Sequence, residues 1–260
     1  MKLRLFQVDA FASRAFAGNP AAVVPLESWL EDATLQAIAA ENNLSETAFF
    51  VPEGDGFEIR WMTPSDEVDL CGHATLASAW VLFNVLEPSR GAVSFRSKSG
   101  PLGVTADGDK LALDFPSRPP EPAAGSLPAV ADALGAPPRA VLAARDYLAV
   151  FADEDEVRAL RPDMARTAAL DRMAVIATAP GRDCDFVSRF FAPAVGIPED
   201  PVTGSAHSTL VPYWAARLGR QRLFARQVSA RGGELWCEDR GGRVSIAGRA
   251  VLYLEGTVTI

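Results

Sequence analysis

FEIRWMTP, residues 57–64, returns in the second half of the chain as FVSRFFAP, residues 186–193. Both copies keep Phe, Arg, an aromatic residue and Pro at the same offsets. Each is followed by an acidic stretch and a glycine that opens an apolar segment, in DLCGHATLASAWVLF from Asp69 and in EDPVTGSAHSTLVPYW from Glu199. The repeat predicts two similar lobes, each with a helix that begins near its glycine. We expect the site in the crevice between the lobes, where both helix N-termini can point at one small anion.

The composition bounds the class of protein. The 260 residues are 48% hydrophobic and 22% charged, enough for one large domain or for two lobes that each bury a core. A net charge of −8 argues against a nucleic-acid partner. The N-terminus lacks the apolar core of a signal peptide, and the longest apolar run, residues 74–86, suits a buried helix better than a membrane span. We therefore expect a soluble cytoplasmic protein without a membrane partner. Three scattered cysteines indicate neither a disulfide framework nor a metal site.

Alternating apolar residues predict mostly antiparallel strands, and ADGDK, residues 106–110, has the composition of a hairpin turn. The segment from Ala74 to Phe83 is apolar on almost every side, so its helix should be enclosed by sheet. The predicted fold is α+β, with two pseudo-symmetric lobes that each curl a barrel-like sheet around a central helix. The Pro-rich residues 116–122 place the boundary between a first lobe, residues 1–117, and a second, residues 118–260, although the C-terminal strand can cross back.

Local signals predict further helix boundaries. SWLE places a helix start at Ser28, with Glu31 completing a capping box, and Asn42–Asn43 is a plausible left-handed stop. The corresponding helix of the second half is expected at 154–160. Pro212 lies several residues into the second glycine-led helix and should kink it or limit its regular part.

The two histidines both fall beside the predicted glycine-led helix starts. His73 follows Gly72 directly, and His207 comes three residues after Gly204. A single histidine is usually structural, but two in matching places favour a role for one of them. We favour His73, which should face the crevice, with its ring neutral because a helix N-terminus disfavours the imidazolium. His207, deeper in its helix, is expected to be structural.

Two acids are candidates for proton transfer or for orienting a catalytic group. Glu46 lies between a helix end and the apolar strand Ala48–Val51, where apolar neighbours would raise the pKa of its carboxyl toward the range useful for acid/base catalysis. The alternative is a solvated loop glutamate. Asp200, in EDPVTG, is a capping acid, a turn residue before Pro201, or a partner that orients a catalytic group.

Cys71 raises the possibility of a thiol-based racemase, which needs a cysteine in each half. The second half has Pro201-Val202-Thr203-Gly204 at the equivalent place and offers none. Cys71 is then most simply a small buried residue. The sequence also lacks the glycine-rich dinucleotide and P-loop motifs and the GxSxG elbow, so nicotinamide, nucleotide and serine-hydrolase functions are not indicated.

Four motifs in order resemble the phenazine-biosynthesis PhzF-like family, which has the diaminopimelate-epimerase-like fold. They span nearly the whole chain: GNPAAVV (18–24), NLSETAFF (43–50), DLCGHATLASAWVLF (69–83) and EDPVTGSAH (199–207). The resemblance implies a cofactor-independent isomerase that moves a proton between carbons of a small carboxylated substrate. It implies catalysis by Glu46 with support from His73 and Asp200. The residues it implies for substrate binding are Gly72, Ser205, Gly204 and Asn19.

The resemblance also separates one mechanism from another. Related thiol-based racemases have cysteine in both glycine motifs, whereas this chain has only Cys71, so proton shuttling by one carboxylate on one face of the substrate is preferred. Thiol-assisted epimerisation and a non-catalytic role in metabolite or protein binding remain alternatives. Relatives imply a homodimer. The phenazine precursor trans-2,3-dihydro-3-hydroxyanthranilate is one possible substrate, since family membership does not fix it.

Overall fold

The computed structural model describes residues 1–260 of the protein, which divide into two compact units. Unit 1 comprises residues 1–114 and 247–260, and unit 2 comprises residues 115–246. Each unit combines strands with a helix that is largely buried. None of the helices combines the length and apolar composition that a membrane crossing requires.

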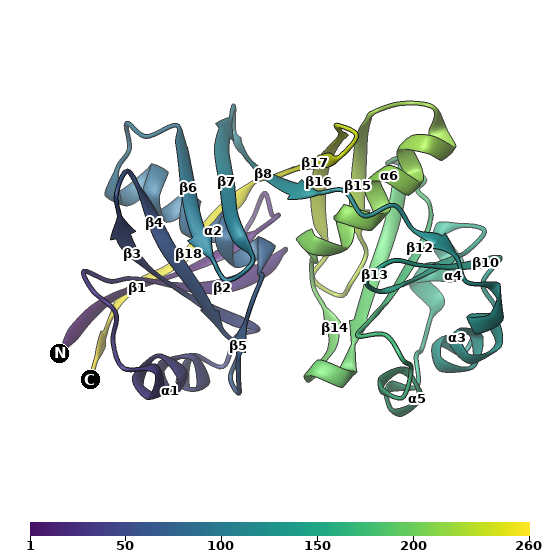
Figure 1. Ribbon diagram of the computed structural model, residues 1–260, viewed down its shortest axis with the longest axis horizontal. Helices are drawn as coiled ribbons and strands as arrows, with labels where there is room; N and C mark the ends of the chain where they lie inside the picture. Colours follow the sequence, from purple (N-terminus) through teal and green to yellow (C-terminus); the bar gives the residue numbers. More distant parts are fainter. The chain divides into compact units, whose positions relative to one another are not determined.

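Unit 1 holds most of the strands of the first half together with the last strand of the chain (Figure 1). Its elements in chain order are β1 (Lys2–Ala10), β2 (Asn19–Pro25), α1 (Asp32–Asn42), β3 (Glu46–Glu53), β4 (Gly56–Met62), β5 (Glu67–Val68), α2 (Gly72–Val81), a π-helical turn (Leu82–Leu86), β6 (Ala92–Ser97), β7 (Gly100–Asp107), β8 (Lys110–Pro116) and β18 (Ala250–Thr259).

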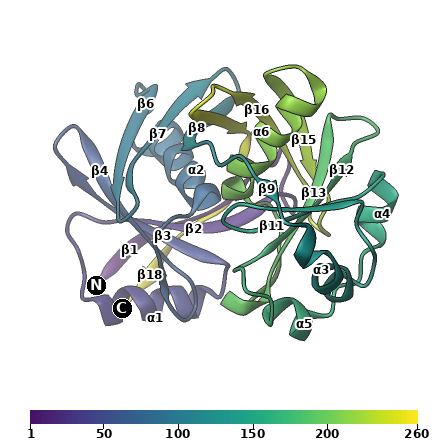
Figure 2. The same ribbon diagram turned by 45° about the vertical axis from the view of Figure 1, so that its right-hand side comes forward.

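The central helix of unit 1 is α2, as the all-round apolar sequence predicted. Only Trp80 of its ten residues is not buried. The helix contacts β1, β2, β3 and β18, and Figures 1 and 2 show it among the strands of this unit. β1 pairs antiparallel with both β2 and β18, so the two ends of the chain lie side by side. The enclosed helix and the curled sheet are the predicted lobe architecture.

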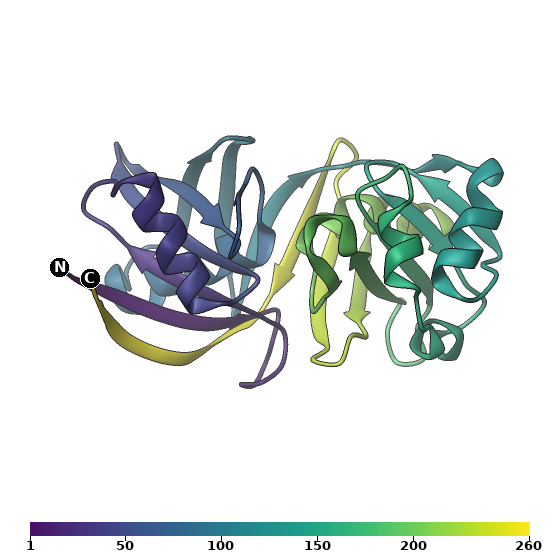
Figure 3. The same cartoon turned by 90° about the horizontal axis from the view of Figure 1, so that it is seen from below.

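The first helix, α1, starts three residues later than predicted and lies across the outside of β3 and β4 (Figure 3). Ser28 does not cap it; Glu31 is the N-cap residue, without a side-chain cap. The intervening residues are held in another way, because the Trp29 indole donates a hydrogen bond to Glu58 and Leu30 packs against the core. The predicted stop is confirmed, since Asn43 has a left-handed φ of 50° and its N–H bonds the carbonyl of Ala39.

Unit 2 has the same kinds of element, with more short helices on its outside. Its elements are β9 (Glu121–Pro122), a 3₁₀ turn (Ala124–Ser126), α3 (Leu127–Leu134), β10 (Ala140–Ala143), β11 (Tyr147–Val150), α4 (Glu154–Ala159), α5 (Met164–Ala168), β12 (Val175–Pro180), β13 (Phe186–Ala192), a 3₁₀ turn (Pro193–Val195), β14 (Ile197–Asp200), a 3₁₀ turn (Gly204–Ala206), α6 (His207–Leu218), β15 (Arg222–Gln227), β16 (Gly233–Asp239) and β17 (Arg243–Gly248).

The sequence repeat is a structural repeat. Its two copies form β4 and β13, and both strands have the same neighbours: an antiparallel strand before, a short antiparallel strand after, and a parallel strand beyond the buried helix. The conserved offset of the arginine has a physical cause. Arg60 makes a bidentate pair with Glu67, and Arg189 makes the equivalent pair with Glu199. Each pair ties its central strand to the acidic segment that leads into the buried helix.

Pro212 was expected to kink the second buried helix, α6, or to limit its regular part, but the helix is not cut short there. α6 continues past Pro212 to Leu218 and ends at Gly219 with a left-handed φ of 66°. Proline removes the N–H that would bond the carbonyl of Ser208, four residues earlier. That carbonyl instead accepts the backbone N–H of Arg118 at 2.8 Å. The Pro-rich segment thus satisfies the group that Pro212 leaves open, and the helix persists.

Candidate active site

A carboxylate and an imidazole meet inside unit 1. Glu46 is the first residue of β3, and His73 is in the first turn of α2. Glu46 Oε2 and His73 Nε2 lie 3.2 Å apart, and the two residues are only 8% and 4% exposed. The contact lacks hydrogen-bond geometry, so neither atom has a hydrogen-bond partner. Two polar atoms that are buried and poorly satisfied are costly to folding, which points to a role beyond stability.

Local structure explains how Glu46 reaches this place. The left-handed Asn43 ends α1 and turns the chain at once into β3. β3 pairs parallel with β2, and Glu46 is opposite Ala21 at the start of that pairing. Burial of Ala48 and Phe49 then fixes which way the strand faces. Glu46 is therefore a residue of a buried strand and not a solvated loop glutamate.

The other side of the His73 ring contacts two further residues. Asn19, the first residue of β2, places its amide Nδ2 at 3.1 Å from Nδ1. Cys71, the N-cap residue of α2, places its sulfur at 3.5 Å from the same nitrogen. All three side chains are buried. His73 thus has a carboxylate on one nitrogen, and an amide and a thiol on the other.

The charge of His73 differs from the expectation. Burial favours the neutral ring, but contact with Cys71 and Glu46 outweighs burial, and the pKa of His73 is raised well above its ordinary value. The prediction of a ring kept neutral by the helix N-terminus is therefore wrong in direction. Burial also raises the pKa of the Cys71 thiol to about 11. Because that thiol is neutral near pH 7, we attribute the upward shift of the His73 pKa to the carboxylate of Glu46.

Glu46, Cys71 and His73 each offer an atom to a metal ion, and these atoms lie within 4.8 Å of one another. Their directions do not suit one ion. The thiol faces Nδ1 of the imidazole and the carboxylate faces Nε2, on the other side of the ring. A metal takes one nitrogen of a histidine, with ligands about 2.0–2.3 Å from the ion. We therefore do not place a metal centre at these three residues.

The start of α2 also offers backbone donors. The first amides of a helix have no partner within it, and their dipoles favour a negative charge. Cys71 precedes the helix without a side-chain cap, and the first helical residue is Gly72, whose lack of a side chain leaves these amides less covered. The helix end therefore has the donors that the binding of a carboxylate needs, beside the Glu46 and His73 pair.

In unit 2 the polar residues before α6 form a separate network. Asp200, the last residue of β14, accepts the hydroxyl of Thr203, whose backbone N–H bonds the side-chain oxygen of Gln227. Gln227 also donates to the Asp200 carbonyl at 2.8 Å. Asp200 thus orients a side chain and does not cap a helix. Thr203 and Gln227 were not predicted; no motif carries Gln227, which reaches the network from β15.

The remaining predicted residues of unit 2 lie at the start of its buried helix. Gly204 and Ser205 form a 3₁₀ turn, and His207 is the first residue of α6. The His207 ring is fully buried and its Nδ1 donates to the carbonyl of Thr203 at 2.9 Å. Burial lowers its pKa to about 4, so the ring is neutral at pH 7. This is the structural role expected for His207.

The structure therefore brings Glu46, His73 and Asn19 into contact within unit 1, next to Gly72. Asp200, Gly204 and Ser205 belong to unit 2 and lie close together in sequence there. Cys71 joins the contacts of His73, although its sequence alone indicated only packing.

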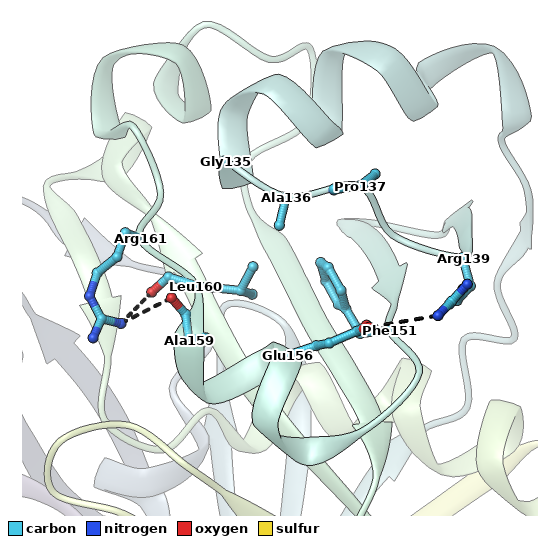
Figure 4. A pocket seen from close by; sticks show the side chains of 9 residues that line it. All are labelled: Gly135, Ala136, Pro137, Arg139, Phe151, Glu156, Ala159, Leu160 and Arg161. Carbon is cyan, nitrogen blue, oxygen red and sulfur yellow. Dashed lines mark hydrogen bonds and ion pairs between the residues drawn. The ribbon is translucent and has the colours of Figure 1, made fainter.

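A cavity of about 550 Å³ lies elsewhere in unit 2, and none of its lining residues is a predicted site residue (Figure 4). Its two arginines are already engaged. Arg139 is ion-paired with Glu156 at 3.7 Å, and Arg161 donates to the carbonyls of Ala159 and Leu160. The cavity therefore offers no concentrated charge for an anionic ligand, and we do not place the active site there.

Comparisons with known proteins show the family of the chain. The family model described as phenazine biosynthesis-like protein (PhzC-PhzF) matches residues 8–256. Two uncharacterized isomerases of Pseudomonas aeruginosa are 54% and 55% identical to the chain, with at least 99% of each chain covered. The crystal structure of a PhzF family protein of Enterococcus faecalis is 49% identical over 100% of both chains, with a TM-score of 0.97.

More distant structures share the fold. A hydroxyproline epimerase of Agrobacterium vitis is 12% identical and has a TM-score of 0.65, over 99% of this chain and 92% of its own. The duplicated lobes, the enclosed helices and the family match together lead to one assignment: the chain belongs to the phenazine biosynthesis-like PhzC-PhzF family.

Proposed function

We propose that this protein is a cofactor-independent isomerase that moves a proton between carbons of a small carboxylate-bearing substrate. The observation that carries the proposal is the buried contact between Glu46 and His73, 3.2 Å apart at the start of α2. The names of the Pseudomonas aeruginosa relatives support the reaction class. A carboxylate and an imidazole at this distance can pass a proton to and from a substrate without another group.

In the proposed reaction the carboxylate of Glu46 takes a proton from a carbon adjacent to an unsaturated or carboxyl group. The C–H bond breaks, and its electron pair spreads into the neighbouring π-system. The same proton then returns from Glu46 to another carbon on the same face, so that the substrate is isomerised and the enzyme is unchanged. The ring of His73 lies beside Glu46, and an N–H at Nε2 can donate to the substrate anion that forms.

Substrate binding follows from the backbone donors beside this pair. The amides at Gly72 and His73 are suited to a substrate carboxylate. Asp200, Ser205 and Gly204 are proposed as further contacts on the strength of the family motif, and Asp200→Asn tests that assignment separately. The expected result for Asp200→Asn is slower proton exchange than in the native protein.

The structure gives the thiol alternative little support. A racemase thiol must ionise to take a proton from carbon, but burial raises the pKa of Cys71 to about 11. We expect Cys71→Ala to keep at least about a tenth of the native exchange rate, because it removes a neighbour of His73 and not the base. Complete loss of exchange in Cys71→Ala with Glu46→Gln still active would return the reaction to the thiol.

The test is solvent deuterium incorporation into substrate, measured by mass spectrometry and NMR. The panel comprises small α-amino and α-hydroxy acids, unsaturated carboxylates and trans-2,3-dihydro-3-hydroxyanthranilate. Once a reactive compound is found, Glu46→Gln should abolish exchange while the compound still binds. Glu154→Gln is a matched control, because Glu154 is also 8% exposed and ion-paired but lies in unit 2 on α4.

Full exchange in Glu46→Gln would refute the proposal. Equal loss in Glu154→Gln would assign the effect to destabilisation. No exchange by the native protein with any member of the panel, together with a stable protein partner, would favour a binding function instead.

A further inference from the structure

We propose that Asn19 is a positioning residue that sets the tautomer of His73, holding the neutral ring with its proton on Nε2, toward Glu46. The expected effect of Asn19 on catalysis rests on the proposed function, whereas the tautomer of His73 follows from the contacts of the ring alone. It differs from the substrate-binding role that the family motif implies for Asn19. That side chain is fully buried and occupied with the imidazole, 54 residues later in the chain.

The direction of the hydrogen bond carries the argument. The amide nitrogen of Asn19 can only donate, and it lies 3.1 Å from His73 Nδ1. Nδ1 must then accept, so the single proton of a neutral ring is on Nε2. Nε2 in turn faces Glu46 Oε2. The proton is then on the side of the ring that faces Glu46, and the hydrogen bond from Asn19 is what places it there.

The backbone before Asn19 is built to hold it in place. The loop from Phe11 to Gly18 contains three residues with left-handed φ: Phe11 at 59°, Phe16 at 68° and Gly18 at 68°. Phenylalanine rarely adopts this conformation, and strained residues persist only where their surroundings enforce them. The buried carboxylate of Asp9 accepts the N–H of Phe16 at 2.9 Å and so fixes the middle of the loop.

Two glycines complete this support. A Cβ on Gly18 would lie 2.1 Å from the carbonyl oxygen of Ala10, so the chain can approach β1 this closely only with glycine. A Cβ on Gly248 would lie 2.3 Å from the ring of Phe11, which packs on the bare backbone there. The loop is thus packed at both ends, and it delivers Asn19 to His73 in one orientation.

The other histidine provides an internal reference. His207 Nδ1 faces the carbonyl of Thr203, which can only accept, so the proton of that neutral ring is on Nδ1. The protein therefore has two histidines of opposite predicted tautomer. Selective ¹⁵N labelling of histidine gives signals from these two rings alone.

The experiment is ¹⁵N NMR of the full-length, histidine-labelled protein, with the pH raised until both rings are neutral. In the native protein, His73 should carry its proton on Nε2 and His207 on Nδ1. Asn19→Asp replaces the donor with an acceptor and should move the His73 proton to Nδ1. Asn19→Leu removes the donor and should leave a mixture of tautomers. The His207 signal should stay unchanged in both variants.

A native His73 with its proton on Nδ1 would overturn the inference without any variant. So would an unchanged His73 tautomer in both Asn19 variants. Cys71→Ala should not change the tautomer; a change there and not in Asn19→Asp would assign control to the thiol and refute the inference.

Activity gives a second readout. With a substrate in hand, Asn19→Asp should lower kcat by roughly ten- to a hundredfold with little change in KM, since a positioning residue acts through the catalytic group. A large rise in KM with kcat unchanged would instead show direct substrate binding. Failure of the proposed function, with no exchange by the native protein, leaves the tautomer measurement intact, so the two proposals fail separately.

Discussion

The buried His207 should make folding strongly dependent on pH. Its ring is fully buried, and burial lowers its pKa from 6.5 to about 4. Each unit of difference between the pKa in the unfolded and folded states corresponds to about 1.4 kcal/mol, so His207 contributes about 3 kcal/mol to the free energy of unfolding. Because the folded state binds the proton less readily, His207 contributes this stability above pH 6.5. The contribution is lost as the pH falls from 6.5 to 4.

The assay is urea denaturation of the native protein and of His207→Asn at a series of pH values between 4 and 7.5. Asparagine can keep the hydrogen bond to the Thr203 carbonyl, but it does not titrate. The carboxylates and His73 are common to both proteins, so they cancel in the difference. The free energy of unfolding of the native protein should fall by about 3 kcal/mol more than that of the variant.

Equal pH dependence of the two proteins would refute the reasoning. A direct ¹⁵N titration of His207 in the folded protein gives a second check, since a pKa near 6.5 would mean that the ring is not desolvated. The predicted loss is a large part of the stability of an ordinary domain, so it should be visible without extrapolation.

Two further predictions concern the support of the site and of the strand repeat. Gly18→Ala should lower the free energy of unfolding by about 3 kcal/mol or more in urea denaturation, because it adds a backbone clash to an unfavourable φ. Gly54→Ala is the control: its φ is 55° and the space around it is open, so it should cost only about 1 kcal/mol. Equal losses in the two variants would contradict the clash at Gly18. Arg60→Ala should cost about 2 kcal/mol, because Glu67 loses the bidentate partner that lowers its pKa to about 2 and keeps only its ion pair with Lys98. Arg96→Ala removes the exposed ion pair with Glu53 and should lower the free energy of unfolding by less than about 1 kcal/mol. Similar losses in Arg60→Ala and Arg96→Ala would show that partial burial does not strengthen the Arg60–Glu67 pair.

The sequence predicted much of the fold because the signals involved are local or periodic. All-round apolar composition indicated that α2 is enclosed, and the repeat indicated that β4 and β13 have equivalent surroundings. Asn43 marked the end of α1 because asparagine tolerates left-handed backbone. Ser28 was wrongly predicted to cap α1, because the preference of serine for a cap position is weaker than the contacts that hold Trp29 and Leu30 outside the helix.

The limits of sequence reasoning lie where distant segments exchange hydrogen bonds. Pro212 looked disruptive because its compensation comes from the N–H of Arg118, far away in the chain. The direction of the pKa shift of His73 was misjudged because the helix dipole is weaker than a carboxylate at 3.2 Å. Gln227 carried no signal at all, because a glutamine in a strand is ordinary until its partners are known.

By itself, then, the sequence determined the duplicated architecture, the enclosed helices and the types of residue available for chemistry. Apolar periodicity and repeated spacing report burial and local backbone form, and these properties survive without knowledge of the fold. Only the tertiary structure decided which polar atoms face one another: Asn19 on one nitrogen of His73 and Glu46 on the other. Hydrogen bonds and ion pairs act over about 3 Å and in fixed directions, so their pairing is settled only when separate segments pack together.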